Sequence, residues 1–400
     1  MMSSIQSAYI HIPFCKQMCH YCNFVKYFYT EKRATEYLQA LEKEIESYIP
    51  GDGNKLRTIY IGGGTPTALD KEQLIWMFEM LHRKFDIAGL EEFTIELNPG
   101  DIDEEKADIL KAYGINRISF GVQVMDDDML KQLGRAHRVQ DVYQTVNILS
   151  KKEFTNISLD LIYALPNQSV EQFQRSLKEA LQFKLPHYST YALQIEPQTV
   201  FYKRHKKGLL HRPREEDEVT MYQMLKESMA ANGVKQYEIS NFAKPGFESK
   251  HNLTYWNNEY YYGFGAGASG YVPGKRIANL RPLPIYIEKA GSGEKPILEI
   301  DKIGVREEIE EELMLGLRKN AGYDERIFQH KFGLSLKDFY SEQLKKLIGQ
   351  GLLTVKQGVW KLTDEGMLLA NLVFEEFILD DQELEEKMRR AKFIDKNLPI

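Results

Sequence analysis

Short apolar runs alternate with longer amphipathic stretches through the first half of the chain. The short runs are rich in β-branched and aromatic residues, which favours β-strands. The longer stretches repeat apolar residues with the helical period, which predicts α-helices with one buried face. The expected strands are Ser7 to Ile12, Thr58 to Ile61, Glu92 to Leu97, Arg117 to Val124, Ile157 to Leu165 and Tyr188 to Ile195. The expected helices are Glu31 to Tyr48, Lys71 to Phe85, Glu104 to Tyr113, Val139 to Ser150 and Val170 to Phe183, with Asp70, Asp103 and Ser169 as N-caps.

About six β/α units in succession predict an α/β fold with a parallel sheet and right-handed crossovers. The pattern fits a doubly wound sheet and also a sheet that rolls toward a barrel. In both, ligands bind outside the carboxyl ends of the strands. The alternation stops near residue 200. We therefore expect a β/α domain over residues 1–200, an extension over 201–300, a C-terminal domain over 301–380 and a charged tail over 381–400.

The C-terminal domain is expected to contain a small hairpin among helices. A strand ends at Val355, Gly358 makes the turn, and a second strand runs from Val359 to Leu362. Thr363 is placed to cap the helix that follows. A helix, hairpin and helix in this order indicate a winged-helix-like module. Such modules often bind DNA, but the final helices are acidic, which favours packing or protein contact.

The charge and composition narrow the function classes. The net charge is −6 and 43% of residues are hydrophobic, as in soluble globular enzymes. There is no basic footprint for nucleic acid, so RNA and DNA are not expected partners. No segment approaches the roughly 18 apolar residues of a transmembrane helix, and the first residues lack the pattern of a signal peptide. We expect a cytoplasmic protein.

All three cysteines of the chain, Cys15, Cys19 and Cys22, lie in one CxxxCxxC stretch. Their odd number and clustering do not resemble a disulfide framework and indicate a reducing compartment. Three thiolates at this spacing can bind a 4Fe-4S cluster and leave one iron open to a small molecule. S-adenosylmethionine, which chelates iron through its amino and carboxylate groups, is the expected molecule. A zinc site completed by His11 or His20 and three buried thiols without metal are the alternatives.

Further polar and glycine residues gather at the carboxyl ends of the expected strands. Gly62, Gly63 and Gly64 follow the second strand, where a backbone without Cβ atoms lets a ligand approach closely. A tight turn is the alternative explanation for these glycines. Side chains that could hold the ribose, amino and carboxylate groups of the ligand are Glu96, Gln123, Arg135 and Asp160. Each of them taken singly also fits a structural polar residue.

With these residues the chain resembles the radical S-adenosylmethionine superfamily, and within it the branch of oxygen-independent coproporphyrinogen III oxidase and the haem chaperones. The motifs that carry the resemblance are YIHIPFC at 9–15 with the cysteine stretch, GGGTPT at 62–67, ELNP at 96–99, RISFGVQ at 117–123, LGRAH at 133–137 and DLIYALP at 160–166. The resemblance continues into the C-terminal half. It implies a partial (β/α)6 barrel with the cluster at its mouth, followed by a helical, winged-helix-like C-terminal domain.

The resemblance also implies which residues touch the cofactors. The three cysteines would bind the cluster. Tyr9, Gly63 and Glu96 would contact one S-adenosylmethionine. The family's further S-adenosylmethionine contacts, including those of a second molecule in the oxidase, fall on Tyr21, Gly64, Thr65, Gln123, Arg135, Asp160 and Ala192.

Two features separate the activities within this branch. The oxidase has a further cysteine two residues after the third, where this chain has Phe24, which has no sulfur. His251 opens HNLTYW, which matches the HNxxYW motif of the haem chaperones. Histidine is an axial ligand of haem iron and flanking aromatic rings can stack on porphyrin, so His251 is the expected haem contact. A structural histidine in a packed aromatic cluster is the alternative.

These features together predict a haem chaperone that carries a 4Fe-4S cluster with S-adenosylmethionine. It would bind haem and deliver it to acceptor proteins, among them respiratory enzymes at the membrane, which implies peripheral membrane contact. The cluster would then serve transfer, assembly or the formation of a homodimer. Oxidative decarboxylation of coproporphyrinogen III is the alternative function, and Phe24 argues against it. A zinc-stabilised interaction module is the third hypothesis.

Overall fold

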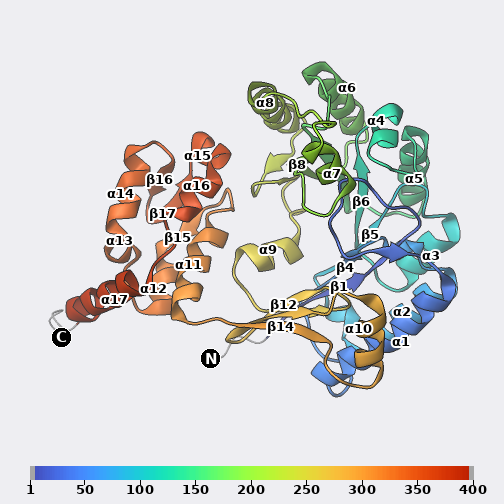
Figure 1. The fold of residues 1–400 in the computed structure, drawn as a ribbon, viewed down its shortest axis with the longest axis horizontal. Helices are drawn as coiled ribbons and strands as arrows, with labels where there is room; N and C mark the ends of the chain where they lie inside the picture. The colour runs from blue at the N-terminus through green and yellow to red at the C-terminus, as the bar shows by residue number, and fades with distance from the viewer. Residues whose placement is uncertain (1–4, 396–400) are drawn as a thin grey trace. The chain divides into compact units, whose positions relative to one another are not determined.

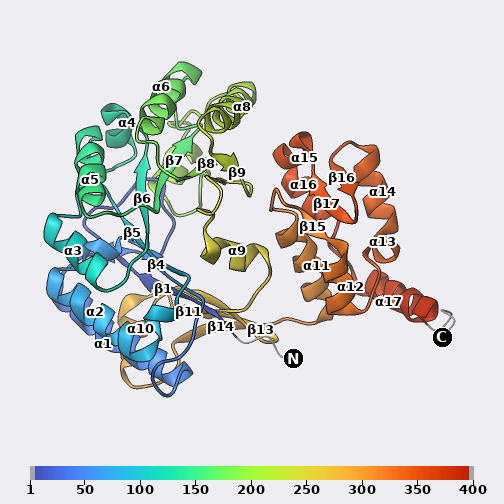
Figure 2. The same cartoon turned by 180° about the vertical axis from the view of Figure 1, so that it is seen from behind.

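The computed structural model describes residues 5–395, and it describes side chains for residues 5–389. Its contacts divide the chain into two compact units (Figures 1 and 2). Unit 1 holds the residues up to Gln236 together with Ser240–His251 and Tyr260–Asp301. Unit 2 holds Tyr237–Ile239, Asn252–Glu259 and the residues from Lys302 onward. Each unit has a hydrophobic core of its own.

Unit 1 is built on a twelve-stranded sheet whose centre is parallel. The central strands are β1 Ser7–Ile12, β4 Thr58–Gly63, β5 Glu92–Leu97, β6 Arg117–Gln123, β7 Ile157–Tyr163 and β8 His187–Ala192. The flanking strands are β9 Lys235–Gln236, β10 Asn241–Ala243, β11 Tyr261–Phe264, β12 Ser269–Val272, β13 Lys275–Asn279 and β14 Ile297–Lys302. The order is β14-β13-β12-β11-β1-β4-β5-β6-β7-β8-β10-β9, so the sheet stays open between β14 and β9. The expected partial (β/α)6 barrel is confirmed in this open form.

The two faces of the central strands differ in polarity, because side chains alternate along a strand. One face carries the apolar residues of the main core, such as Ile10, Ile59 and Ile95. The other face carries buried polar residues that bond to one another across strands. Ser158 bonds to the His187 ring at 2.8 Å. This polar face forms the inside of the partial barrel.

Helices cover the apolar face, and both views show them along one side of the sheet (Figures 1 and 2). They are α1 Glu31–Tyr48, α2 Lys71–Lys84, α3 Glu104–Ala112, α5 Val139–Lys151 and α6 Val170–Leu181. All five were expected, with ends within a residue or two of these. Asp70, Asp103 and Ser169 each accept a hydrogen bond from the backbone amide three residues later, so the three predicted N-caps are confirmed.

Several elements escaped the sequence pattern. These are β2 Phe14–Cys15, β3 Tyr27–Phe28, α4 Asp127–Gln132, α7 Val200–Lys206, α9 Lys250–Trp256, α10 Leu283–Gly291 and the flanking strands β9 to β14. Helix α8 Glu215–Ala231 lies within the expected extension. Strands β6 and β7 end earlier than predicted because Gln123 and Ala164 have positive φ values of 72° and 55°. A left-handed residue cannot continue a strand.

Unit 2 consists of helices around a three-stranded sheet. The helices are α11 Val305–Gly316, α12 Glu325–Phe332, α13 Leu336–Phe339, α14 Ser341–Gly349, α15 Asp364–Leu368, α16 Ala370–Glu375 and α17 Asp381–Asp395, and the strands are β15 Tyr323–Asp324, β16 Leu353–Lys356 and β17 Val359–Leu362. The predicted hairpin is β16 and β17, whose two-residue turn places Gln357 and Gly358 at positive φ, as type I′ turns require. Thr363 Oγ1 accepts from the Gly366 amide at 3.0 Å, which confirms the predicted cap.

No helix within residues 5–395 combines the length and the apolar character needed to span a membrane.

Candidate functional site

The cysteine loop, residues 16–26, is closed at its base by two short strands. β2 and β3 pair in parallel, with Cys15 opposite Phe28. Cys15 therefore sits on regular backbone and is buried, whereas Cys19 and Cys22, farther along the loop, are half-buried. All three thiols are free of disulfide bonds. β2 and the loop thus present three separate thiols close to the carboxyl end of β1.

Side chains from neighbouring segments fix the Cys15 thiol. Thr65 Oγ1 donates a hydrogen bond to Cys15 Sγ at 3.6 Å, and Asn98 Nδ2 donates to Thr65 Oγ1 at 2.7 Å. Burial raises the pKa of the Cys15 thiol to about 11, while the hydrogen bond from Thr65 acts to lower it. The Thr65 hydroxyl therefore stabilises a thiolate, which is the form that binds a metal.

Arg135 lies beside the same loop. Its Nη1 donates to Asn98 Oδ1 at 2.9 Å and to Cys19 Sγ at 3.6 Å, and its Nη2 donates to the carbonyl oxygen of Gly121. Its Nε is buried and has no hydrogen-bond partner among the described residues. A cavity of about 220 Å³ is lined by Cys19, Asn98 and Arg135. A buried guanidinium with an unused donor suits an anionic group such as a carboxylate.

Two half-buried carboxylates lie inside the partial barrel. Glu96 accepts hydrogen bonds from the Tyr60 hydroxyl at 2.7 Å and from the Gly63 amide at 3.0 Å. Asp160 accepts from the Ser119 hydroxyl at 3.2 Å. Burial raises the pKa of both carboxyl groups, that of Asp160 to about 7, and the charge of Glu96 adds to the rise at Asp160. A cationic ligand group beside them would favour their ionised forms.

The glycine run at the end of β4 packs directly against β1 and β2. Gly63 has a φ of +110°, and a Cβ atom there would lie 2.4 Å from the His11 ring. A Cβ atom at Gly64 would lie 2.7 Å from the carbonyl oxygen of Phe14. The close approach of two backbones is therefore one reason for glycine at these positions. It also leaves the Gly63 amide directed at Glu96.

His11, one of the two histidines that could complete the alternative zinc site, has both ring nitrogens engaged. Nε2 donates to the carbonyl oxygen of Val25 at 2.8 Å, so Nδ1 accepts from the Tyr9 hydroxyl at 2.9 Å. Burial lowers the pKa of His11 to about 4, which keeps the ring neutral. His11 thus orients Tyr9 and ties β1 to the cysteine loop instead of offering a free nitrogen.

The other predicted contact residues lie at the ends of β6 and β8 and on the cysteine loop. The left-handed Gln123 ends β6, and its Oε1 accepts from the Tyr191 hydroxyl at 3.4 Å. Ala192 is the last residue of β8. Tyr21 packs its ring against Phe201, with ring centroids 6.4 Å apart. The structure therefore brings the predicted residues to the carboxyl end of the sheet.

The sequence reasoning assigned no individual role to Tyr60, Asn98 or Tyr191. Tyr60 bonds to Glu96, Asn98 links Thr65 to Arg135, and Tyr191 bonds to Gln123. The alternation of side chains between the two faces of a strand could have indicated that Tyr60 and Tyr191 face the site. Tyr60 shares its strand face with Gly62, and Tyr191 shares its face with the interior residue Ser189. Asn98 lies two residues after Glu96, within the ELNP motif.

The donor set fits a 4Fe-4S cluster with one iron open to S-adenosylmethionine. The chain offers three cysteines, and each thiolate of such a cluster binds a different iron. Among the described residues, no group of three or more His, Cys, Asp or Glu side chains is arranged to hold a single metal ion. Beside the loop, Arg135 offers an unused donor, and Glu96 and Asp160 offer half-buried carboxylates. These groups suit the carboxylate, amino and ribose groups of the ligand.

His251 lies at the opposite end of the sheet. Its Nδ1 donates to Thr58 Oγ1 at 2.8 Å, because the Thr58 hydroxyl donates its hydrogen to Ser7 Oγ at 2.9 Å. Thr58 and Ser7 are the first residues of β4 and β1, whereas the cysteine loop and Gly63 lie at the carboxyl ends of these strands. At about 3.3 Å per residue, roughly 15–20 Å of sheet separates the two places.

The imidazole of His251 is fully buried in this conformation. Burial lowers the pKa of His251 to about 3, so the ring is neutral. The start of α9 is also fixed, because the buried Glu92 carboxylate accepts from the Ser249 hydroxyl and from the amides of Lys250 and His251. A carboxylate at a helix N-terminus is favourable. The haem contact expected at His251 stays a prediction, and the structure describes a packed structural histidine there.

Known proteins are similar to this chain in sequence and in fold. The radical SAM superfamily matches residues 9–180, and the HemN C-terminal domain matches residues 305–369. The chain is 46% identical to the haem chaperone HemW of Bacillus subtilis (strain 168) over 376 residues, which are 94% of this chain and 99% of that protein. It is 32% identical to HemW of Escherichia coli (strain K12), over 94% of this chain and 98% of that protein. Coproporphyrinogen III oxidase (HemN) from Escherichia coli has a similar structure, with a TM-score of 0.81, 24% identity, and coverage of 94% of this chain and 90% of that chain. At that identity the likeness to HemN shows a shared fold.

Proposed function

Because the chain belongs to the HemW family of the radical S-adenosylmethionine superfamily, we propose that it is a haem chaperone, which binds haem and delivers it to acceptor proteins. The observation that carries this proposal is the similarity to haem chaperones along nearly the whole length of the chain. The proposed place of action is the cytoplasm, with respiratory enzymes at the membrane among the acceptors. The absence of a basic footprint for nucleic acid is consistent with this role.

The residues at the carboxyl end of the sheet would hold the two cofactors. Cys15, Cys19 and Cys22 would bind the cluster, which when present supplies electrons and an open iron for S-adenosylmethionine. Arg135 would use its unpaired Nε toward the ligand carboxylate. Glu96 would meet a cationic or hydroxyl group from inside the partial barrel, where Tyr60 and Gly63 fix its orientation.

The fold likeness to HemN favours a second function, the oxidative decarboxylation of coproporphyrinogen III. Phe24 argues against it. The Phe24 side chain is 64% exposed on the cysteine loop, at the position where the resemblance places a further cysteine in the oxidase. An exposed phenyl ring contributes apolar surface and no sulfur ligand. We therefore propose binding and transfer of a tetrapyrrole, without decarboxylation, as the function of this chain.

A paired assay on the full-length protein tests this proposal. Anaerobic reconstitution with iron and sulfide should give about four irons per chain, and Cys22→Ser should lower that number. Added haem should then give a Soret band with 1:1 saturation. Coproporphyrinogen III, supplied with S-adenosylmethionine and a reductant, should remain unconverted. Conversion of coproporphyrinogen III, or the absence of haem binding by the reconstituted protein, would overturn the chaperone proposal.

A further inference from the structure

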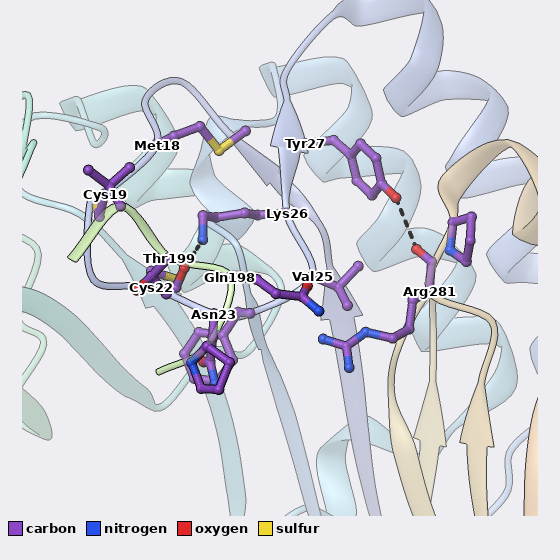
Figure 3. A pocket seen from close by; sticks show the side chains of 14 residues that line it. Met18, Cys19, Cys22, Asn23, Val25, Lys26, Tyr27, Gln198, Thr199 and Arg281 are labelled. Atoms are coloured by element: carbon purple, nitrogen blue, oxygen red, sulfur yellow. Dashed lines mark hydrogen bonds between the residues drawn. The ribbon is translucent and has the colours of Figure 1, made fainter. Parts of the chain in front are cut away.

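A second, larger cavity lies against the outer side of the cysteine loop (Figure 3). Its volume is about 610 Å³, which is within the range of about 300–1,000 Å³ that is usual for sites of small molecules and cofactors. Cys19 and Cys22 form part of its wall. The other walls come from the rest of the loop, from residues 197–200 before and at the start of α7, and from residues 281–282 before α10. Three segments that are distant in sequence therefore enclose it.

Six of the lining residues are apolar, and four of these six are exposed. The apolar lining residues are Met18, Phe24, Val25, Pro197, Val200 and Pro282. Phe24 is 64% exposed and Val200 is 41% exposed. Single exposed apolar side chains are ordinary on a soluble domain, whereas several that line one cavity can mark the site of a ligand. This part of the wall suits a ligand that has an apolar face as well as polar groups.

Two cationic side chains, those of Lys26 and Arg281, complete the lining. In Figure 3 the Lys26 ammonium group points toward Cys22, and Arg281 reaches in from the opposite wall. No lining residue is acidic, and among the described residues neither cation pairs with a carboxylate. Lys26 donates to the carbonyl oxygen of Cys22, which uses only one of its three hydrogens.

The backbone that carries Arg281 is fixed in place. The Tyr27 hydroxyl donates to the carbonyl oxygen of Arg281 at 3.1 Å and accepts from the amide of Leu283 at 3.0 Å. Tyr27 is itself held by β3, which pairs with the strand that ends at Cys15. The backbone positions of the two cations are thus tied to the same framework as the cysteine loop.

We propose that this cavity binds the propionate-bearing edge of haem, with one carboxylate on Lys26, the other on Arg281, and the macrocycle against Phe24. This inference rests on the proposed function and assigns the binding site of the haem. Haem combines a flat apolar ring with two carboxylates on one edge, and the cavity combines apolar walls with two unpaired cations. Arg and carboxylate can also form two parallel hydrogen bonds. The bound haem would lie beside the cluster thiols Cys19 and Cys22.

The test is haem titration of the reconstituted full-length protein, followed by the Soret band. Lys26→Gln and Arg281→Gln should each weaken haem binding about tenfold, because each removes one charge-assisted hydrogen bond. The double variant should lose about 50- to 100-fold. Lys55→Gln and Arg33→Gln serve as matched controls, since both residues are exposed and lie outside the cavity. Iron content and far-ultraviolet circular dichroism check that each variant is folded and loaded.

A modified ligand tests the same inference on the unaltered protein. Haemin dimethyl ester keeps the ring and the iron but lacks both carboxylate charges, so it should bind about as weakly as haemin binds to the double variant. Equal affinity for haemin and its dimethyl ester would overturn the assigned binding site, and so would unchanged affinity of the double variant for haemin. Either result would leave the chaperone proposal intact. Failure of the unaltered protein to bind haemin would instead overturn the proposed function.

Discussion

Replacing His251 with alanine should destabilise the protein and leave its affinity for haem unchanged. The imidazole is fully buried, donates to Thr58 Oγ1 at 2.8 Å, and lies against the Tyr60 ring with centroids 5.2 Å apart. The hydrogen bond is worth about 1 kcal/mol. The ring contact adds about 0.5–1.5 kcal/mol, and the cavity left behind adds about 1–2 kcal/mol more. The expected loss is about 3 kcal/mol of unfolding free energy.

Urea unfolding of the full-length protein measures this loss. With a denaturant slope of about 3 kcal/mol per molar, the unfolding midpoint should fall by about 1 M. Thr58→Val removes the same hydrogen bond from the other side and should lower the midpoint by a smaller amount. His205→Ala is the matched control, because His205 is exposed on α7 and its removal should change stability by less than about 0.5 kcal/mol.

The haem titration of the same variants decides the role of His251. If His251 is a packed structural residue, the folded His251→Ala protein should bind haem within about threefold of the unaltered chain. A tenfold weaker affinity combined with an unchanged urea midpoint would refute this reasoning. That result would show that haem reaches the imidazole and that α9 leaves the position fixed by Glu92.

Two further predictions concern Glu44 and Gly63. Burial raises the pKa of Glu44 from 4.5 to about 7, so the folded protein binds this proton more tightly than the unfolded chain. Its contribution to stability is full below about pH 4.5 and falls by about 3 kcal/mol as the pH rises through 7. Glu44→Gln should remove this part of the pH dependence of the unfolding free energy between pH 5 and 8. The same pH dependence in both proteins would contradict the prediction. Gly63→Ala should cost about 2–4 kcal/mol, since its Cβ atom would lie 2.4 Å from the His11 ring at a positive φ. Gly274→Ala, at φ +74° with nothing within 4 Å of the new Cβ atom, should cost only about 1–2 kcal/mol, and equal unfolding midpoints for the two variants would rule out the clash.

The local elements of unit 1 could be predicted because their signals are local. The period of apolar residues reports which face of a strand or helix is buried, and a cap such as Asp70 bonds an amide only three residues away. The parallel order of the strands followed from the β/α alternation, which places every carboxyl end at one edge. The cysteine spacing, Glu96 near the end of one strand and Asp160 along another could therefore be assigned to one site from the sequence.

The contacts inside that site depend on chain segments that meet only in three dimensions. Arg135 Nη1 reaches Cys19 Sγ across 116 positions of sequence, and Tyr191 reaches Gln123 across 68. The Gly-rich run has a packing role that spacing could not reveal, since its neighbours are the His11 ring and the Phe14 backbone. Burial and pKa shifts follow from the same tertiary contacts.

The sequence by itself determined the fold class, the family and the three thiols that fit a cluster, since each of these depends on residue type and spacing along the chain. Only the tertiary structure decided where the HNxxYW histidine lies. His251 bonds to the first residue of β4, whereas the cysteine loop lies at the carboxyl ends of the strands. The tertiary structure also places Lys26 and Arg281 at one cavity. A sequence motif records which residues are present, but the end of the sheet that they reach depends on the path of the whole chain.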